Sequence, residues 1–299
     1  MKEKASHLPV GRVLKGIAGF YTVADENGVI MEAKARGRLR REDELLVGDL
    51  VRYQRCEEGK CTIEEILPRT TVLKRPYIAN VTQILLVFAL KNPDYNTVLI
   101  DRFLVLAEAA AIPCMIVFNK ADLVKKAEAE KIARLYEEIG YKVRVTSTLT
   151  NQGKMLLKRD LREQVTVVAG PSGVGKSALL NMVSPGYRLK TGTVSRKIGR
   201  GRHTTRQVEL LPLPGGGYVA DTPGFTQIDL DFLTPDELPS FFTEFTRMGG
   251  CRFRGCLHLA EPGCSVKSGV ENGKIHGFRY EHYKAFMQEI RGFYENRYK

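Results

Sequence analysis

Residues 169–180 read AGPSGVGKSALL and directly follow the apolar run QVTVV (164–168). This stretch matches the pattern G-x-x-x-x-G-K-[S/T] between a predicted strand and a predicted helix. Glycines let such a loop wrap closely around phosphate oxygens, with its backbone N–H groups pointing inward. Lys176 is expected to contact the β and γ phosphates, and the Ser177 hydroxyl to coordinate Mg²⁺. The stretch therefore predicts an α/β domain that binds a nucleoside triphosphate through Gly170, Pro171, Ser172, Gly173, Val174, Gly175, Lys176, Ser177 and Ala178.

A second motif, Asn119-Lys120-Ala121-Asp122, lies upstream and follows the apolar run IPCMIVF (112–118). The Asp122 carboxylate can accept hydrogen bonds from both N1–H and the exocyclic amino group of guanine, a pattern that adenine does not offer. Lys120 can lie along the base, and Asn119 can tie this loop to the phosphate-binding loop. The tetrapeptide alone is a weak signal, since a charged helix start looks the same, but beside the first motif it predicts GTP rather than ATP. Ser147, at the end of the next predicted strand, is expected to support the guanine O6 atom through a backbone N–H.

Two stretches downstream are expected to sense the γ-phosphate. Asp221-Thr-Pro-Gly224 ends another predicted strand, so Asp221 can hold Mg²⁺ through a water and the Gly224 N–H can meet the γ-phosphate. In the segment GRGRHTTR (199–206), a threonine hydroxyl can cap the Mg²⁺ ion while the γ-phosphate is present. We favour Thr205 for this role, with Thr204 as the alternative. The predicted magnesium ligands are thus Ser177, Thr205 and Asp221.

The residue after Gly224 bears on hydrolysis. Where Ras-type GTPases carry a water-positioning glutamine, this chain has Phe225, which cannot orient water, so slow intrinsic turnover is expected. His203, beside the threonines, is the internal candidate for an acid/base or water-orienting group. A contact of His203 with RNA, or no role, is the alternative. The predicted catalytic residues are His203, Thr205 and Lys176.

The order of the motifs is inverted relative to most GTPases, because the guanine-binding motif precedes the phosphate-binding loop. A circular permutation explains this inversion: the chain is cut and rejoined elsewhere while spatial neighbours are kept. The chain then leaves the GTPase domain directly after the segment 221–224.

Patterns outside the motifs divide the chain into three domains. Residues 1–70 show short alternating strands broken by glycine, which predict a small β-barrel of the OB type, a fold that often binds oligonucleotides. Residues 71–232 alternate buried strands with helices, which predicts a doubly wound parallel sheet. Residues 233–299 hold a cysteine cluster and a last helix. The predicted architecture is an N-terminal OB-fold barrel, a circularly permuted P-loop GTPase domain and a mostly helical zinc-binding domain.

The cysteine cluster has the spacing Cys251-x4-Cys256-x-His258-x5-Cys264. Three thiolates and one imidazole fill a tetrahedral zinc shell and leave no position for water, so one structural zinc ion is predicted. Unrelated thiols are the alternative. Cys56 and Cys61 flank a Glu-Glu-Gly-Lys turn and could face each other across a hairpin, with a structural role or none.

The net charge of +12 points to an acidic partner. No Asp or Glu occurs between Gln164 and Val208, and this basic strip suits a polyanion such as RNA, although an ordinary solvated face is the alternative. Its basic residues are Lys176, Arg188, Lys190, Arg196, Lys197, Arg200, Arg202 and Arg206. No apolar run is long enough to span a membrane, and the N-terminus lacks the apolar core of a signal peptide. We therefore expect a cytoplasmic protein without a membrane partner.

Taken in order, NKAD, GPSGVGKS, GRHTTR, DTPGF and the Cys-Cys-His-Cys cluster resemble the circularly permuted bacterial GTPases of the ribosome-small-subunit-dependent GTPase A family. The resemblance covers the whole chain. It implies that the protein hydrolyses GTP to GDP and phosphate, stimulated by the 30S ribosomal subunit, during late maturation of that subunit. It also implies contacts with 16S ribosomal RNA, and a monomer is expected.

Two other functions remain open on the residues alone. The chain could be a GTP-sensing RNA-binding scaffold that scarcely hydrolyses GTP. It could also be a GTPase that acts on tRNA or another ribonucleoprotein. Turnover with and without 30S subunits separates the first from an enzyme, and competition by tRNA tests the second.

Overall fold

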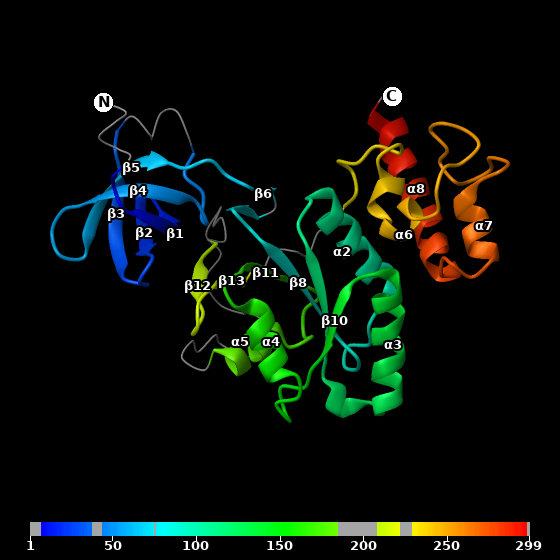
Figure 1. Cartoon of the computed structure of the whole chain (residues 1–299), viewed down its shortest axis with the longest axis horizontal. Coiled ribbons are helices and arrows are strands. Elements are labelled where there is room, and N and C mark those ends of the chain that lie inside the picture. Colours follow the sequence, from blue (N-terminus) through cyan, green and yellow to red (C-terminus); the bar gives the residue numbers. More distant parts are fainter. Residues whose placement is uncertain (1–6, 38–43, 75, 185–207, 222–228, 298–299) are drawn as a thin grey trace.

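The computed structural model describes residues 7–37, 44–74, 76–184, 208–221 and 229–297. Three parts follow one another along the chain: a closed barrel, a six-stranded sheet flanked by helices, and a mostly helical C-terminal part (Figure 1). The barrel and the C-terminal part lie at opposite ends of the molecule, with the sheet between them. The predicted multidomain fold class is confirmed. Among the described residues, no helix combines the length and apolarity that a membrane span requires.

The barrel is closed by five strands in the order β1-β2-β3-β5-β4. Their side chains alternate between a buried interior and the surface, because successive strand residues point to opposite faces. The interior is filled by apolar residues such as Val13, Val51 and Ile63, all fully buried. The strands are β1 (Val10–Ile17), β2 (Phe20–Asp25), β3 (Ile30–Ala35), β4 (Leu50–Arg55) and β5 (Lys60–Ile66).

The two barrel cysteines do not form a pair. Cys61 lies inside the barrel core, where burial raises its pKa to about 11, and its register partner on β4 is Arg55. Cys56 is exposed, with its Sγ 3.3 Å from Thr62 Oγ1. The expectation that they could face each other across the hairpin is therefore wrong, because the two side chains point to different sides of the barrel wall.

The central sheet has the strand order β10-β9-β8-β11-β13-β12. Neighbouring strands are parallel except for β12 and β13. A short ribbon of β6 (Val72–Lys74) and β7 (Tyr77–Ala79) precedes this sheet. The six strands are β8 (Gln83–Ala89), β9 (Cys114–Asn119), β10 (Lys142–Val145), β11 (Val165–Ala169), β12 (Leu210–Pro212) and β13 (Tyr218–Asp221).

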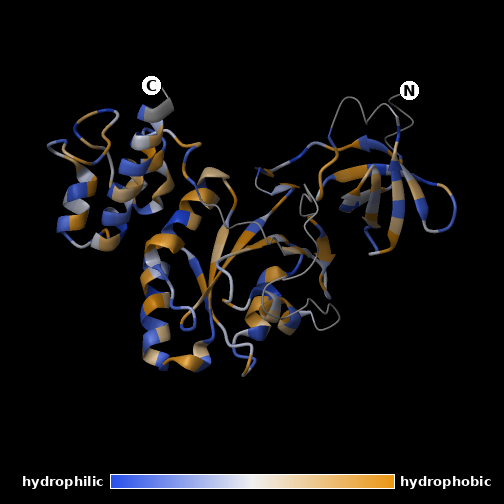
Figure 2. Cartoon of the chain, turned by 180° about the vertical axis from the view of Figure 1, so that it is seen from behind, coloured by the Kyte–Doolittle hydropathy of each residue, from blue (hydrophilic) through white to orange (hydrophobic). Residues whose placement is uncertain are grey.

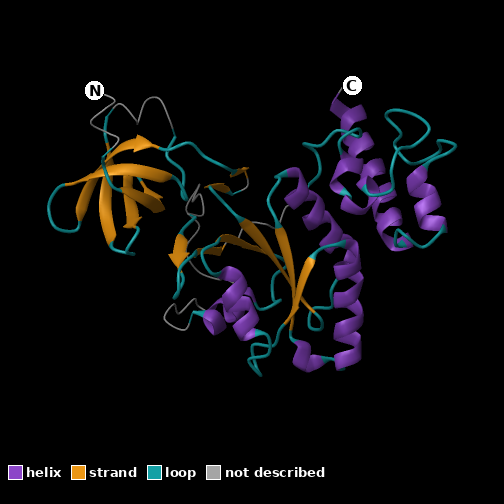
Figure 3. Cartoon of the chain, viewed as in Figure 1, coloured by secondary structure: helices purple, strands orange, loops and turns teal. Residues whose placement is uncertain are grey.

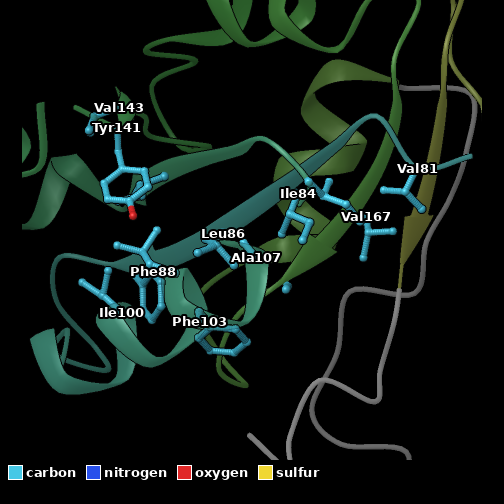
Figure 4. Packing of buried hydrophobic residues seen from close by; sticks show 14 of the residues in the cluster. Val81, Ile84, Leu86, Phe88, Ile100, Phe103, Ala107, Tyr141, Val143 and Val167 are labelled. Carbon is cyan, nitrogen blue, oxygen red and sulfur yellow. The ribbon is translucent and has the colours of Figure 1, made fainter. Parts of the chain in front are cut away.

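Helices cover both faces of this sheet (Figure 3). Leu86 and Phe88 of β8 face α2 and α3, whereas Leu85 and Val87 face α4 and α5, so the strand is buried on both sides. Figure 4 shows β8 packing against Phe103 of α2, and Figure 2 shows the apolar colour of the strands. The helices are α2 (Thr97–Ala109), α3 (Lys126–Ile139), α4 (Lys154–Leu161) and α5 (Lys176–Val183), with the 3₁₀ turn η1 (Ala121–Leu123).

The barrel lies against one edge of the sheet. Lys15 of β1 forms a β-bridge and an ion pair with Glu209, which precedes β12. The Arg12 guanidinium lies over the ring of Tyr218 on β13, with 5.4 Å between the guanidinium carbon and the ring centroid. These contacts hold β1 of the barrel beside β12, the edge strand of the sheet.

The C-terminal part packs on α2 of the sheet domain. Its own core includes Phe242, Tyr283 and Phe286, and Val105 of α2 belongs to the same cluster. At this contact Arg279 of α8, fully buried, lies 2.8 Å from Asp101 of α2 (Nη1 to Oδ1). The helices of this part are η2 (Leu238–Phe241), α6 (Thr243–Thr246), α7 (Ser265–Glu271) and α8 (Gly277–Arg297).

Candidate functional site

The glycine-rich loop connects β11 to α5, as its sequence predicts. Gly170 has a φ of 135°, and a Cβ there would collide with the carbonyl oxygen of Val87 on β8. Gly175 has a φ of 95°, and a Cβ there would lie 2.5 Å from Asn119 Nδ2. Only glycine satisfies both the left-handed backbone and the close approach at these positions. The loop is thereby held close to β8 at Val87 and to the end of β9 at Asn119.

Lys176 begins α5 and turns back over the loop. Its ammonium group donates hydrogen bonds to the carbonyl oxygens of Gly170 and Pro171, at 2.8 and 2.7 Å. Ser177 and Ala178 follow in the first helical turn, where backbone N–H groups have no partner within the helix. The ammonium and the helix N-terminus together give the loop a positive potential that suits an anionic ligand.

Asn119 joins the second motif to this loop. It is the last residue of β9 and is fully buried. Its Nδ2 donates to Val174 O at 2.9 Å, and its Oδ1 accepts from Thr146 Oγ1 at 3.1 Å. One side chain therefore holds the residues after β9, β10 and β11 together at the carboxyl edge of the sheet, where open α/β sheets bind their ligands.

Lys120 extends from the second motif along the glycine-rich loop. Its backbone is left-handed, with a φ of 61°, and its Nζ donates to Gly173 O at 2.7 Å and to Asn92 O. Asn92 belongs to the connection between β8 and α2, and nothing in the sequence signalled its part in the site. The stem of Lys120 thus bridges two loops.

Asp122 is exposed at the start of η1, with one carboxylate oxygen fixed by Ser147. The Ser147 hydroxyl donates to Asp122 Oδ1 at 2.5 Å, and Ala121 N donates to Thr146 O at 3.0 Å. The backbone N–H of Ser147 donates to Gln152 O at 3.2 Å. Ser147 therefore acts on Asp122 through its side chain, while its own N–H is used within the loop.

The structure places the predicted γ-phosphate residues only in part. Asp221 ends β13, and its register partner on the neighbouring strand β11 is Val168, so its backbone lies at the edge from which the glycine-rich loop starts. His203, Thr204, Thr205, Gly224 and Phe225 lie outside the described residues, as does the basic strip from Arg188 to Arg206.

Cys251, Cys256, His258 and Cys264 form the second candidate site, with all four ligand atoms within 4.8 Å of one another. His258 Nδ1 lies 3.5 Å from Cys251 Sγ and 3.3 Å from Cys264 Sγ, and these two sulfurs are 3.9 Å apart. A tetrahedral ion with bonds of about 2.1–2.3 Å separates its ligands by about 3.4–3.8 Å. The four residues therefore suit a metal ion.

Second contacts fix the cluster in place. Tyr280 and Tyr283 of α8 donate to the carbonyl oxygens of His258 and Leu257, at 2.6 and 2.5 Å. Burial lowers the pKa of His258, which favours the neutral imidazole that binds metals. Ser265 N and Oγ both contact Cys251 Sγ, a partner that sequence spacing did not indicate. The other nearby histidines, His276 and His282, pair instead with Glu138 and Asp101.

Two family models match the chain. The model described as RsgA GTPase matches residues 66–231, and the RsgA N-terminal domain matches residues 10–63. A relative from Caldanaerobacter subterraneus subsp. tengcongensis, named small ribosomal subunit biogenesis GTPase RsgA, is 46% identical over 97% of this chain and 98% of its own length. A protein of the same name from Geobacillus kaustophilus is 48% identical over 94% of this chain and 97% of its own.

Solved structures agree with these matches. The crystal structure of YjeQ from Thermotoga maritima is 38% identical, has a TM-score of 0.84, and matches 95% of this chain and 99% of that protein. YloQ, described as a circularly permuted GTPase, is also 38% identical, with a TM-score of 0.81 and 96% of both chains covered. The similarity therefore extends over all three parts of the fold.

Proposed function

The chain belongs to the RsgA family of GTPases, and from this membership we propose that it hydrolyses GTP to GDP and phosphate during late maturation of the small ribosomal subunit. The hydrogen bond of 2.9 Å between Asn119 Nδ2 and Val174 O carries the proposal. It ties the motif expected at the guanine base to the loop expected at the phosphates, so that a single GTP can occupy both. The circular permutation keeps this contact while reversing the order of the two motifs.

The guanine base is recognised by the loop after β9. Asp122, oriented by the Ser147 hydroxyl, accepts hydrogen bonds from N1–H and the exocyclic amino group. Lys120, whose ammonium is fixed by Gly173 O, lays its apolar stem along the base. Ala121 completes the turn by its bond to Thr146 O.

The phosphates are bound by the glycine-rich loop, with the Lys176 ammonium and the backbone N–H groups of Gly170 and of residues 172–178 as donors. Ser177, Thr205 and Asp221 would hold Mg²⁺, which neutralises charge that develops on the phosphates. Thr205 and Gly224 release their contacts when the γ-phosphate leaves. Phe225 cannot orient water, so His203 or a group of the ribosome supplies that function, and turnover by the free protein is slow.

The Cys/His cluster holds one zinc ion in a structural role. Three sulfurs and one imidazole complete a four-coordinate shell, so no position remains for a reactive water. The cluster fixes the loops before α7 against α8 through Tyr280 and Tyr283. Its contribution is thus to folding of the C-terminal domain.

Purified protein is expected to contain one equivalent of zinc, and its removal by a chelator to make residues 233–299 sensitive to protease while GTP is still bound. Because binding of a structural metal is part of the free energy of folding, the loops lose their shape when the ion leaves. Metal analysis, limited proteolysis and GTP titration measure the three quantities. Cys264→Ser should lose the ion, and Cys56→Ser, an exposed thiol outside the cluster, should keep it. Zinc-free protein with protected C-terminal residues would contradict the assignment.

The partner follows from the relatives, which are named for biogenesis of the small ribosomal subunit. We propose that a monomer in the cytoplasm binds 16S ribosomal RNA through the OB-type barrel and the acid-free strip between Gln164 and Val208. The net charge of +12 supports a polyanionic partner. The domain division at residues 1–70, 71–232 and 233–299 belongs to the same proposal.

The deciding experiment is a GTPase assay titrated with 30S subunits, 50S subunits and free ribosomal RNA. Only 30S subunits are expected to raise turnover strongly, by about 10²- to 10⁴-fold if they supply the missing water-activating group. The stimulation at subsaturating 30S should fall steeply with salt, because phosphate contacts release counterions. Unchanged turnover would favour a GTP-sensing scaffold, and stimulation by tRNA would favour the other ribonucleoprotein.

A further inference from the structure

An aromatic residue flanked by two arginines protrudes from the metal-binding loop. Between the ligands Cys251 and Cys256 the chain runs Arg252-Phe253-Arg254-Gly255, and all four residues are exposed. The Phe253 side chain is 46% exposed, and the Arg252 guanidinium carbon lies 5.6 Å from its ring centroid. We call residues 252–254 the loop tip. It lies at the end of the molecule opposite to the barrel (Figure 1).

The loop tip is held in place by the metal-binding cluster and by Gly263. Its two ends are the ligands Cys251 and Cys256, whose sulfurs belong to the four-residue cluster. Arg252 N donates to Gly263 O at 3.2 Å, and a Cβ on Gly263 would approach Arg252 Cβ to 3.2 Å, so the arginine stem lies directly on that glycine. A metal ion in the cluster would keep the tip in one conformation, which lowers the entropy lost on binding.

The charge of the loop tip is not compensated nearby. Among the described residues, neither Arg252 nor Arg254 forms an ion pair with an acidic side chain. Phe232 is the contrasting case in the same domain: it is 53% exposed but follows Asp231 directly. A single exposed phenylalanine is ordinary on a protein surface, so it is the two guanidinium groups beside Phe253, without an acidic partner among the described residues, that point to a ligand.

An aromatic ring between two guanidinium groups matches an unpaired nucleotide. Unstacked bases of RNA stack on phenylalanine rings and arginine planes, and the flanking phosphates pair with arginine. A duplex hides its base faces, and a protein partner needs an apolar patch much larger than one ring. The chemistry therefore favours single-stranded RNA over both.

We propose that the loop tip binds an unpaired RNA nucleotide, with its base stacked on Phe253 and adjacent phosphates bound by Arg252 and Arg254. This site rests on the proposed ribosomal function for its biological source, an exposed base of ribosomal RNA. Its chemistry does not depend on GTP, because the loop tip lies in the C-terminal domain and not at the nucleotide loops.

The chain contains no tryptophan, so Phe253→Trp places the variant's one tryptophan at the site. A single-stranded 8-mer RNA is expected to quench the tryptophan emission saturably. The same sequence in a duplex is expected to cause no saturable quenching. Phe232→Trp, at a position of similar exposure beside an aspartate, is the matched control and should show no saturable quenching. Zinc content close to that of the unmodified protein verifies that both variants are folded.

Affinity gives a second readout in the holoprotein. Phe253→Ala is expected to weaken 8-mer binding about 5- to 150-fold, the equivalent of roughly 1–3 kcal/mol per stacked base, and Phe253→Tyr to restore it. Replacing Arg252 and Arg254 with Gln should flatten the salt dependence by a slope of about 0.7 for each phosphate that is no longer neutralised.

The outcomes separate this site from the proposed function. Quenching at Phe253→Trp without any 30S stimulation of turnover would refute the ribosomal role and keep the RNA site. Full 30S stimulation with no quenching, and with equal 8-mer affinity for Phe253→Ala, would overturn the RNA site alone. Loss of 30S affinity in Phe253→Ala without any response to free RNA would assign the loop tip to a ribosomal protein and overturn it as well.

Discussion

Asp122→Asn is expected to lower the affinity for GTP about 100-fold or more and to raise the affinity for xanthosine triphosphate. The carboxylate accepts two hydrogen bonds from guanine, whereas an amide offers one acceptor and one donor, so one guanine N–H meets another N–H. Hydrogen bonds to a charged group are worth about 1.5–3 kcal/mol each, and 1.4 kcal/mol corresponds to a factor of ten. Xanthine carries a carbonyl where guanine has the amino group and can accept from the new amide. Isothermal titration with both nucleotides measures the exchange.

Two controls delimit the effect. Asp94→Asn changes an exposed acid in the connection that Lys120 contacts, where Asp94 pairs with the exposed Lys91, and should leave GTP affinity within about twofold. Ser147→Ala removes the hydroxyl that holds Asp122 and should weaken GTP by about 5- to 10-fold, since one supporting hydrogen bond is removed. Equal GTP affinity of Asp122→Asn and the unmodified protein would show that the base binds elsewhere.

Arg279→Met is expected to lower the free energy of unfolding by about 3–5 kcal/mol. Arg279 is fully buried, its Nε donates to Glu244 Oε1 at 2.6 Å, and its Nη1 lies 2.8 Å from Asp101 Oδ1. Burial alone would lower the pKa of Arg279, but the two carboxylates raise it above its ordinary value. Without the guanidinium, the buried Glu244 carboxylate loses its ion pair and Asp101 is left with His282 and the Tyr136 hydroxyl, which is the costly way to break a buried ion pair. Urea denaturation followed by circular dichroism measures the change.

The neighbouring Arg102→Met provides the control for that substitution. Arg102 pairs with Glu289 between the same two helices, but both side chains are partly exposed, so a loss of about 1 kcal/mol or less is expected. A triple variant with apolar residues at 101, 244 and 279 should recover part of the lost stability, because both carboxylates are removed together with the guanidinium. Recovery is incomplete because His282 and the Tyr136 hydroxyl then lose their contact with Asp101. A stability of Arg279→Met equal to that of the unmodified protein would refute the importance of this ion cluster.

Local spacing allowed much of the site to be predicted. Three sets of residues each lie within a short stretch of sequence: the glycine-rich loop, the motif from Asn119 to Asp122, and the four Cys/His ligands. Their chemistry can therefore be inferred from residue types and spacing without knowledge of the fold. The hydrogen bond from Lys120 Nζ to Asn92 O was not predictable, because every residue type carries a backbone carbonyl. The pairing of Asp101 with Arg279 was hidden for another reason: it joins two distant helices whose approach depends on the whole fold.

The fold was predicted where hydrophobic patterns were long. The fully buried run of β8 and the amphipathic pattern of α3 both correspond to observed elements. The helix α4 was not predicted, since eight residues carry too little periodicity for a pattern to stand out. The ribbon of β6 and β7, with three residues in each strand, was missed for the same reason.

The helix α2 belongs to two hydrophobic cores at once. Phe103 and Leu104 pack into the core of the sheet, while Val105 packs into the C-terminal core with Phe286. If either core unfolds on heating, α2 loses the packing on that side, and the other core then rests on a helix that is held from one side only. In the zinc-loaded protein the sheet and the C-terminal helices should therefore share one calorimetric transition, although they are separate in sequence, while the barrel retains a core of its own. A chain shortened at residue 233 would expose to water the side of α2 that carries Val105, and with it an apolar surface that promotes association between copies.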